Sequence, residues 1–218
     1  MLLYYITDMR QLGGRERLLA KIAEAAAAEV DYIQIRERQL TTRELEQLAS
    51  AALARVREAA NKTKLLINSR VDVALAVGAD GVHLRSNDIA ASEARAIWAK
   101  SAGRTDCVLG VSCHSIADVM SAESHGADFA VFGPVFAKLG SSDPPVGIEA
   151  LRQATHRSVP PDKRVEAGQS LGMPVIALGG VTLANAAECA QAGSAGVAAI
   201  RLFQDNDVAQ VVKALSCV

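Results

Sequence analysis

Short apolar runs recur along this chain, and more polar segments lie between them. The runs show little alternation of apolar and polar residues, which is typical of strands buried on both faces of a parallel sheet. Eight strands are predicted in this way: Leu2–Thr7, Tyr32–Arg36, Lys64–Asn68, Gly81–Leu84, Val108–Ser112, Phe129–Phe132, Val175–Leu178 and Gly196–Ile200.

The segments between the runs have helical periodicity. Leu45, Leu48 and Ala52, for example, fall on one face of the second predicted helix. Thr, Ser or Asp can cap several of these segments, and Gly closes others. The predicted helices are Arg17–Glu29, Thr41 or Thr42 to Ala60, Val71–Val77, Ala91–Ala99, Ser115–His125, Gly147–His156, Thr182 to Ala192 and Asp207–Leu215.

Eight strands that alternate with eight helices predict a closed (β/α)8 TIM barrel, and we expect residues 1–218 to form this single domain. A doubly wound open sheet is the alternative. That fold usually has fewer strands and a glycine fingerprint after the first one, which is absent here.

Composition narrows the class of protein. Half of the residues are hydrophobic, which is enough for a large core. The 23 basic side chains nearly balance the 24 acidic ones, so no charge excess would attract nucleic acid or an anionic membrane. The four cysteines form no CxxC pair, which favours a reduced protein. Without a visible signal peptide or an apolar run of about 18 residues, we expect a soluble cytoplasmic protein.

A glycine pair directly follows the seventh predicted strand. Glycine lets the backbone approach a bound group closely, and free amides at such a turn suit an anion. Gly179 and Gly180 therefore predict a phosphate-binding cradle at the C-terminal end of this strand.

Polar and basic side chains converge at other strand ends, where the active site of a barrel lies. Gln34, Arg36 and Arg38 lie at the end of the second strand, and Asn68 ends the third. Arginine binds phosphate or carboxylate in bidentate fashion. We therefore interpret Arg36 as an anion ligand, although a surface ion-pair network is the alternative. Asn68 either contacts the ligand or caps the next helix.

His114 directly follows the fifth strand, which places its imidazole at the mouth of the barrel. Histidine is the side chain best suited to proton transfer near neutral pH. The alternative is a histidine that only makes hydrogen bonds within the turn. Neighbouring Cys113 is interpreted as a packing residue, and His83, inside an apolar strand, as structural.

A metal site is incomplete in the sequence. Asp88, beyond the fourth strand, is a candidate Mg²⁺ ligand, but Ser69 stands where a second carboxylate is needed.

Two connections are longer than the compact spacing of the other strands and helices. Phe136–Gly147 is placed where a mobile lid would lie, and Arg157–Gly172 is predicted to be a surface excursion.

The chain resembles the thiamine phosphate synthase/TenI superfamily over essentially its whole length. The matching segments, in order, are YYITD, DYIQIRER, LLINSRVDVALAVGADGVHL, LGVSCHS, GADFAVFGPVF and PVIALGGVTLANAAECAQAGSAGVAAI. The resemblance implies a TIM barrel with a phosphate site at the glycine pair.

Two enzymes share this scaffold. Thiamine phosphate synthase joins a pyrimidine diphosphate to a thiazole phosphate with Mg²⁺, whereas TenI-type tautomerase aromatises a carboxythiazole phosphate without metal. Synthases typically have Lys at position 38, Asp at position 69 to serve Mg²⁺, and a Thr-x-Thr/Ser-Lys loop near 137–140. This chain has Arg38, Ser69 and Ala137–Gly140 instead.

These departures favour a TenI-like thiazole tautomerase, an isomerase of thiamine biosynthesis without cofactor. His114 would move the proton, and Arg36 or Arg38 would orient the carboxylate. The resemblance places the substrate among residues of several strand ends: Gln34, Asn68, Gly147, Gly179, Gly180, Ile200 and Arg201. The alternatives are a Mg²⁺-dependent thiamine phosphate synthase with Asp88 as metal ligand, or a silent barrel that binds a thiamine precursor. A homo-oligomer is compatible with either enzyme.

Overall fold

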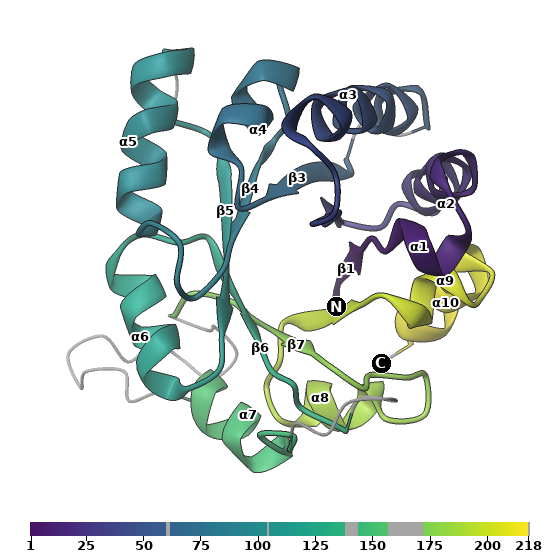
Figure 1. The fold of residues 1–218 in the computed structure, drawn as a ribbon. Helices are drawn as coiled ribbons and strands as arrows, with labels where there is room; N and C mark the ends of the chain where they lie inside the picture. Colours follow the sequence, from purple (N-terminus) through teal and green to yellow (C-terminus); the bar gives the residue numbers. More distant parts are fainter. Residues whose placement is uncertain (60–61, 104, 138–143, 157–171, 218) are drawn as a thin grey trace.

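Eight parallel strands form a closed barrel in the computed structural model, which describes residues 1–59, 62–103, 105–137, 144–156 and 172–217 (Figure 1). The strands pair in chain order, and the last pairs with the first. They are β1 (Leu2–Ile6), β2 (Tyr32–Ile35), β3 (Lys64–Asn68), β4 (Gly81–Leu84), β5 (Val108–Cys113), β6 (Phe129–Phe132), β7 (Val175–Leu178) and β8 (Gly196–Ala199). The predicted (β/α)8 barrel is confirmed.

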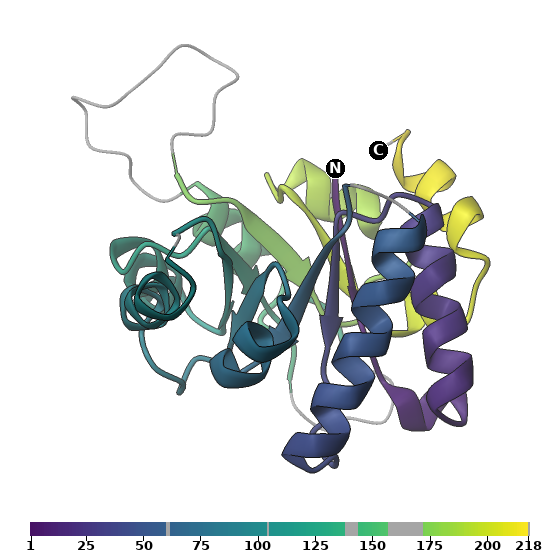
Figure 2. The same ribbon diagram turned by 90° about the horizontal axis from the view of Figure 1, so that it is seen from above.

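Helices surround the strands, and α2 and α3 run side by side in both views (Figures 1 and 2). The short helices α1 and α9 were not predicted, because four residues are too few to show a helical period. The helices are α1 (Met9–Leu12), α2 (Arg15–Ala27), α3 (Thr42–Ala59), α4 (Val71–Val77), α5 (Ala91–Ala102), α6 (Ile116–Ser124), α7 (Ile148–Thr155), α8 (Ala186–Gln191), α9 (Arg201–Gln204) and α10 (Val208–Leu215).

The barrel closes where β8 pairs with β1, with Leu2 opposite Gly196 and Tyr5 opposite Ala199. Gly196 permits this approach, because a Cβ atom there would lie only 2.1 Å from the carbonyl oxygen of Leu2. The side chain of Gln204 in α9 fixes the same seam. Its amide oxygen accepts from the Asp8 N–H at 2.8 Å, and its amide nitrogen donates to the Asp8 carbonyl at 3.1 Å.

Large side chains fill the inside of the barrel. Tyr4 and Phe129 meet edge to face with ring centroids 5.5 Å apart, and Tyr32 packs against Phe129 at 4.9 Å. Gly110 in β5 leaves room for them, since a Cβ there would lie 2.5 Å from the Phe129 ring. A ligand must therefore bind above this layer, at the C-terminal ends of the strands.

Several helix boundaries differ from the prediction by two to four residues, for example in α2, α5 and α8. The helix expected to begin at Thr182 begins at Ala186, because the Asn185 side chain accepts from the Thr182 N–H at 2.8 Å and holds a turn there.

The predicted lid at Phe136–Gly147 and the excursion at Arg157–Gly172 fall largely on residues 138–143 and 157–171, which lie outside the described residues. In the described parts of the chain, every helix is too short or too polar to cross a membrane.

Candidate functional site

A chain of hydrogen bonds runs through the top of the barrel and links four strands. The Gln34 amide donates to the Tyr4 hydroxyl at 2.8 Å, and that hydroxyl lies 3.1 Å from Nδ1 of His83. Nε2 of His83 in turn lies 2.8 Å from the Ser112 hydroxyl. Gln34, Tyr4 and His83 are buried, whereas Ser112 is partly exposed at the mouth.

The donors of this chain fix its direction. The amide nitrogen of Gln34 can only donate, so the Tyr4 hydroxyl accepts that bond and donates its own O–H to Nδ1 of the neutral His83 ring. The His83 proton then lies on Nε2 and is donated to Ser112. Burial, followed by the nearby charge of Arg36, lowers the pKa of His83 to about 3, so the ring is neutral. The Ser112 hydroxyl keeps its own proton for a group at the mouth, and both ring nitrogens of buried His83 are engaged within the protein.

Two arginines at the end of β2 carry charges that the described residues leave unpaired. Arg36 is half-buried and Arg38 is exposed, and neither guanidinium forms a hydrogen bond or ion pair with another described residue. Burial and then the repulsion of Arg38 lower the pKa of Arg36. The backbone beneath them is held firmly, since Thr7 accepts from the Arg36 N–H at 3.0 Å and donates to buried Glu37 at 2.7 Å. The pair is suited to bind an anion.

The ends of β3 and β4 are joined by a polar cluster of four residues, Asn68, Ser69, Arg85 and Asp88. The Ser69 hydroxyl accepts from the Asn68 amide at 3.0 Å and from Nε of Arg85 at 3.1 Å. Nη2 of Arg85 lies 2.9 Å from Oδ1 of Asp88, and the Arg85 N–H donates to Oδ2 at 2.8 Å. The sequence did not single out Arg85, because its importance depends on these contacts.

This cluster does not fit a divalent metal. Both carboxylate oxygens of Asp88 accept hydrogen bonds from Arg85. Burial raises the pKa of Asp88, but hydrogen bonds from Ser69 and Arg85 outweigh it and leave the pKa below its usual value. Among the described residues, no three His, Cys, Asp or Glu side chains are grouped so that they could hold a metal ion. A guanidinium already occupies the position beside Asp88.

His114 lies at the start of the β5–α6 connection and is exposed. Its Nδ1 lies 2.6 Å from the Gly133 carbonyl, so Nδ1 carries the proton and Nε2 is free to accept. Its backbone N–H donates to Asp118, which closes a capping box with Ser115 at the beginning of α6. The side chain thus joins the β5 end to the β6 end at the mouth.

Open amides lie across the mouth from the basic residues. Gly179 and Gly180 have positive φ angles of 97° and 65°, which suit glycine. In the described part of the chain, the N–H groups of Gly179, Gly180, Arg201 and Leu202 donate to no acceptor. The two turns are adjacent because β7 pairs with β8.

Three further residues were predicted to bind the substrate, and one of them, Gly147, departs from this pattern. Ile200 is the N-terminal cap residue of α9, while the Arg201 side chain is exposed. Gly147 precedes α7 with a φ of 86°, but its N–H donates to the Val135 carbonyl at 3.2 Å. The Gly147 amide is therefore engaged within the protein.

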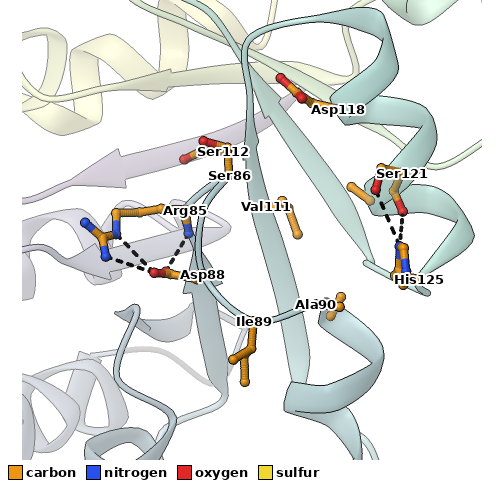
Figure 3. A pocket seen from close by; sticks show the side chains of 12 residues that line it. Arg85, Ser86, Asp88, Ile89, Ala90, Val111, Ser112, Asp118, Ser121 and His125 are labelled. Atoms are coloured by element: carbon orange, nitrogen blue, oxygen red, sulfur yellow. Dashed lines mark hydrogen bonds and ion pairs between the residues drawn. The ribbon is translucent and has the colours of Figure 1, made fainter.

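A cavity of about 190 Å³ lies between the β4–α5 connection and α6 (Figure 3). Asp88 and Ser112 line it together with Ser121 and His125 of α6. The Arg85 side chain extends away from α6 in this view, with Asp88 beside its guanidinium. Arg85 and Asp88 thus border the cavity, while the Arg85 guanidinium points away from α6.

Comparisons with known proteins agree on one family. Residues 3–203 match the family model described as thiamine monophosphate synthase. A thiamine-phosphate synthase of Methanoculleus marisnigri is 38% identical over 98% of this chain and 92% of the relative. One of Roseiflexus sp. is 35% identical over 91% and 76%. The solved thiamine phosphate pyrophosphorylase of Pyrococcus furiosus covers 99% of this chain and 94% of its own, with 29% identity and a TM-score of 0.78.

These relatives overturn the predicted activity. The expected TenI-like thiazole tautomerase is an isomerase, whereas the sequence relatives are named thiamine-phosphate synthases and the solved structure a thiamine phosphate pyrophosphorylase, which are transferases. The prediction of a tautomerase is wrong. The prediction rested on three departures from the usual synthase pattern, at Arg38, Ser69 and Ala137–Gly140. Because the similar relatives are named as synthases, these departures do not indicate a different reaction.

Proposed function

The chain belongs to the thiamine monophosphate synthase family, and we propose that it is a thiamine-phosphate synthase. Such an enzyme couples a pyrimidine diphosphate to a thiazole phosphate and releases pyrophosphate. The observation that carries the proposal is that open backbone amides and basic side chains lie at different strand ends of one barrel mouth, where each set is suited to an anion. The open amides lie after β7 and β8, and the basic side chains lie after β2 and β4. Two phosphorylated substrates need two such places.

The thiazole phosphate binds the amides after β7 and β8 in this proposal. Gly179, Gly180 and the first residues of α9 offer N–H groups without an internal acceptor. Backbone amides at such turns bind phosphate through directed hydrogen bonds, and here they need no lysine or arginine. Ile200 and Arg201 contribute through the backbone.

The diphosphate binds on the basic side. Arg36 and Arg38 form no ion pair with a described carboxylate, and Asn68 ends β3, the strand that pairs with β2. Charge develops on the diphosphate as its bond to carbon breaks, so fixed cations at this place lower the barrier. The half-buried position of Arg36 strengthens its interaction with that charge, because water screens it less.

The pyrimidine ring lies between the two sides in this proposal. Ser112 presents a hydroxyl proton there, since its oxygen accepts from neutral His83. Gln34 stays buried against Tyr4, so it positions this chain beneath the ring and keeps Ser112 in one orientation.

His114 has no proton to move in this reaction. A thiazole ring nitrogen attacks through its lone pair, and pyrophosphate leaves as an anion. We therefore assign His114 a positioning role through its hydrogen bond to the Gly133 carbonyl.

Mg²⁺ would neutralise pyrophosphate in synthases with two carboxylates, but the side chains at 69 and 88 do not fit it here. The four cysteines form no disulfide, which suits a cytoplasmic enzyme.

A coupling assay tests the proposal. The purified protein is incubated with the hydroxymethylpyrimidine diphosphate and the thiazole phosphate, with Mg²⁺ or with EDTA, and thiamine phosphate and pyrophosphate are quantified. We expect equal amounts of both products in at least one condition. Binding of both substrates without product in either condition would instead identify a silent barrel.

A further inference from the structure

Arg85 is held rigidly at the point where β3 and β4 end. Its Nε lies 3.1 Å from the Ser69 hydroxyl and 3.2 Å from Oδ1 of Asp88, and Nη2 lies 2.9 Å from the same oxygen. Ser69 is itself fixed by Asn68 and adopts a φ of 61°, which is unusual outside glycine. The guanidinium is thus oriented by two neighbours in advance of any ligand.

One edge of this guanidinium is open. Arginine carries five N–H donors, and Ser69 and Asp88 engage only those on Nε and Nη2. In the described part of the chain, Nη1 has no acceptor, and 44% of the side chain is exposed. An arginine that is fixed on one edge and free on the other can bind a phosphate oxygen with little loss of side-chain entropy.

The cluster belongs to the basic side of the mouth. Asn68 pairs with His83 across the β3–β4 ladder, and the charges of both Arg36 and Asp88 act on His83. Arg85 is therefore the third arginine near the proposed diphosphate, together with Arg36 and Arg38.

The charges of the cluster balance without a metal. In a site with carboxylates at both 69 and 88, one divalent cation makes the set neutral. Here Ser69 removes one negative charge, and Arg85 supplies one positive charge next to the remaining carboxylate, so the set is again neutral. The Arg85 guanidinium, which is part of the protein chain, thus supplies the positive charge that a bound cation would supply.

We propose that Arg85, clamped by Ser69 and Asp88, replaces a divalent cation as the ligand of the diphosphate in this protein. The inference rests on the proposed function, because it takes the diphosphate to bind on this side of the mouth. It assigns a binding role to a residue outside the predicted set, and it makes diphosphate binding independent of Mg²⁺.

Calorimetric titration with inorganic pyrophosphate tests the role of Arg85 without requiring turnover. In EDTA, we expect the wild-type protein to bind pyrophosphate, and Arg85→Ala to bind it roughly tenfold to a hundredfold more weakly, as for a lost charge-assisted hydrogen bond. Arg85→Lys keeps the charge but not the planar geometry, so its affinity is expected to lie between these two values. Unchanged binding by Arg85→Ala, in a protein that still melts cooperatively, would overturn the proposal.

Arg57→Ala is the matched control. Arg57 pairs with Asp80 at 2.8 Å, and their side chains are 44% and 11% exposed, against 44% and 12% for Arg85 and Asp88. Asp80 precedes β4, so this pair lies at the opposite end of the barrel. Loss of pyrophosphate affinity in Arg85→Ala but not in Arg57→Ala supports the assignment. An equal loss in both variants would show a general effect of breaking an ion pair.

A double variant tests the exchange of guanidinium for metal. Ser69→Asp combined with Arg85→Ala provides two carboxylates with no guanidinium beside them, so we expect weak pyrophosphate binding in EDTA and much tighter binding when Mg²⁺ is present. Mn²⁺ binding, followed by electron paramagnetic resonance, should appear in this variant and be weak in the wild type. A wild-type protein that binds pyrophosphate only with Mg²⁺ would refute the inference, even if the coupling assay succeeds. Metal-free pyrophosphate binding without coupling would refute the proposed function alone.

Discussion

His83 illustrates how one buried side chain is kept in a single protonation state. Both ring nitrogens are engaged, Nδ1 with Tyr4 and Nε2 with Ser112, and the ring is almost fully removed from water. A proton added to Nδ1 would face the hydroxyl proton of Tyr4, and it would also be repelled by Arg36. The neutral ring is therefore a requirement of the native hydrogen bonds.

This requirement predicts an acid sensitivity. The pKa of His83 is about 3 in the folded protein and about 6.5 in the unfolded chain, so the unfolded chain binds a proton first as the pH falls. Stability is complete above pH 6.5 and decreases between pH 6.5 and 3. The loss between pH 7 and 5 is expected to be about 2 kcal/mol, at about 1.4 kcal/mol per unit. Urea unfolding followed by circular dichroism at both pH values measures it.

His83→Gln should lose most of that pH-dependent decline, even though the variant is less stable at pH 7. His125→Gln changes an exposed histidine at the end of α6 and should keep the full decline. If His83→Gln declines as steeply as the wild-type protein, a different group is responsible.

Single residues show where sequence reasoning succeeds and where it stops. Arg36 and Arg38 were identified as a basic pair because their position after an apolar strand is visible in the sequence, although their ligand remains a prediction. Arg85 was not identified, because nothing in its local sequence shows that Ser69, sixteen positions away, orients it. Side-chain contacts between neighbouring strand ends depend on the barrel, so a linear pattern does not contain them.

At the scale of elements, the glycine turn after β7 depends on two separate properties of Gly180. Its φ of 65° is unfavourable for other residues, and a Cβ there would lie 2.6 Å from the Ala137 carbonyl. Gly78, which ends α4, has a similar φ of 70°, but no atom lies within 4 Å of its Cβ position. Alanine at Gly78 would therefore cause backbone strain alone, whereas alanine at Gly180 would cause both backbone strain and a steric clash.

We expect Gly78→Ala to lower the free energy of unfolding by about 1 kcal/mol, the usual cost of the left-handed conformation. Gly180→Ala should cost more than that and should also weaken thiazole phosphate binding by roughly tenfold or more, because the amide cradle must move away from Ala137. Urea unfolding and calorimetry on both variants measure the two effects. Equal phosphate affinity in the two variants would contradict the cradle.

The strands were predictable to within one residue because each is a short, mostly apolar run that is followed by polar residues or by glycine. The beginning of α8 could not be predicted as closely. Thr182 resembles a capping residue, yet the Asn185 side chain uses the Thr182 N–H to make a turn first. Thr182 and Asn185 are both candidate capping residues within four positions. Which of them precedes the helix depends on their contacts in the folded chain.

At the scale of the whole molecule, barrel closure depends on the narrow seam between β1 and β8. We expect Gly196→Ala to destabilise the protein by about 4 kcal/mol or more, because its Cβ would overlap the Leu2 carbonyl at 2.1 Å. At about 2–4 °C per kcal/mol for a chain of this size, the melting temperature should fall by about 10 °C or the protein should not accumulate in soluble form.

Gly126→Ala provides the comparison, since its Cβ position has no atom within 4 Å and only its φ of 74° is unfavourable. A thermal melt of both variants distinguishes the two causes. If Gly196→Ala melts within a few degrees of Gly126→Ala, the seam tolerates more separation than its geometry indicates.

The fold could be predicted from eight apolar runs, but the reaction could not. Positions 38, 69 and 137–140 were judged one at a time, and each departure was counted as a lost part of the diphosphate site. In the structure, the change at Ser69 is accompanied by Arg85, which contacts it directly. Compensation between two residues is a property of the assembled site, and a comparison of single positions does not reveal it.

The seam between β1 and β8 also determines the order in which this protein can mature on the ribosome. Asp8 bonds Gln204, a partner 196 positions further along, so β1 has only β2 beside it while most of the chain is being made. Such distant contacts slow folding, and an unpaired apolar strand edge is a site of aggregation until its partner arrives. We therefore expect the edge of β1 that faces β8 to stay open until the last strand has been made.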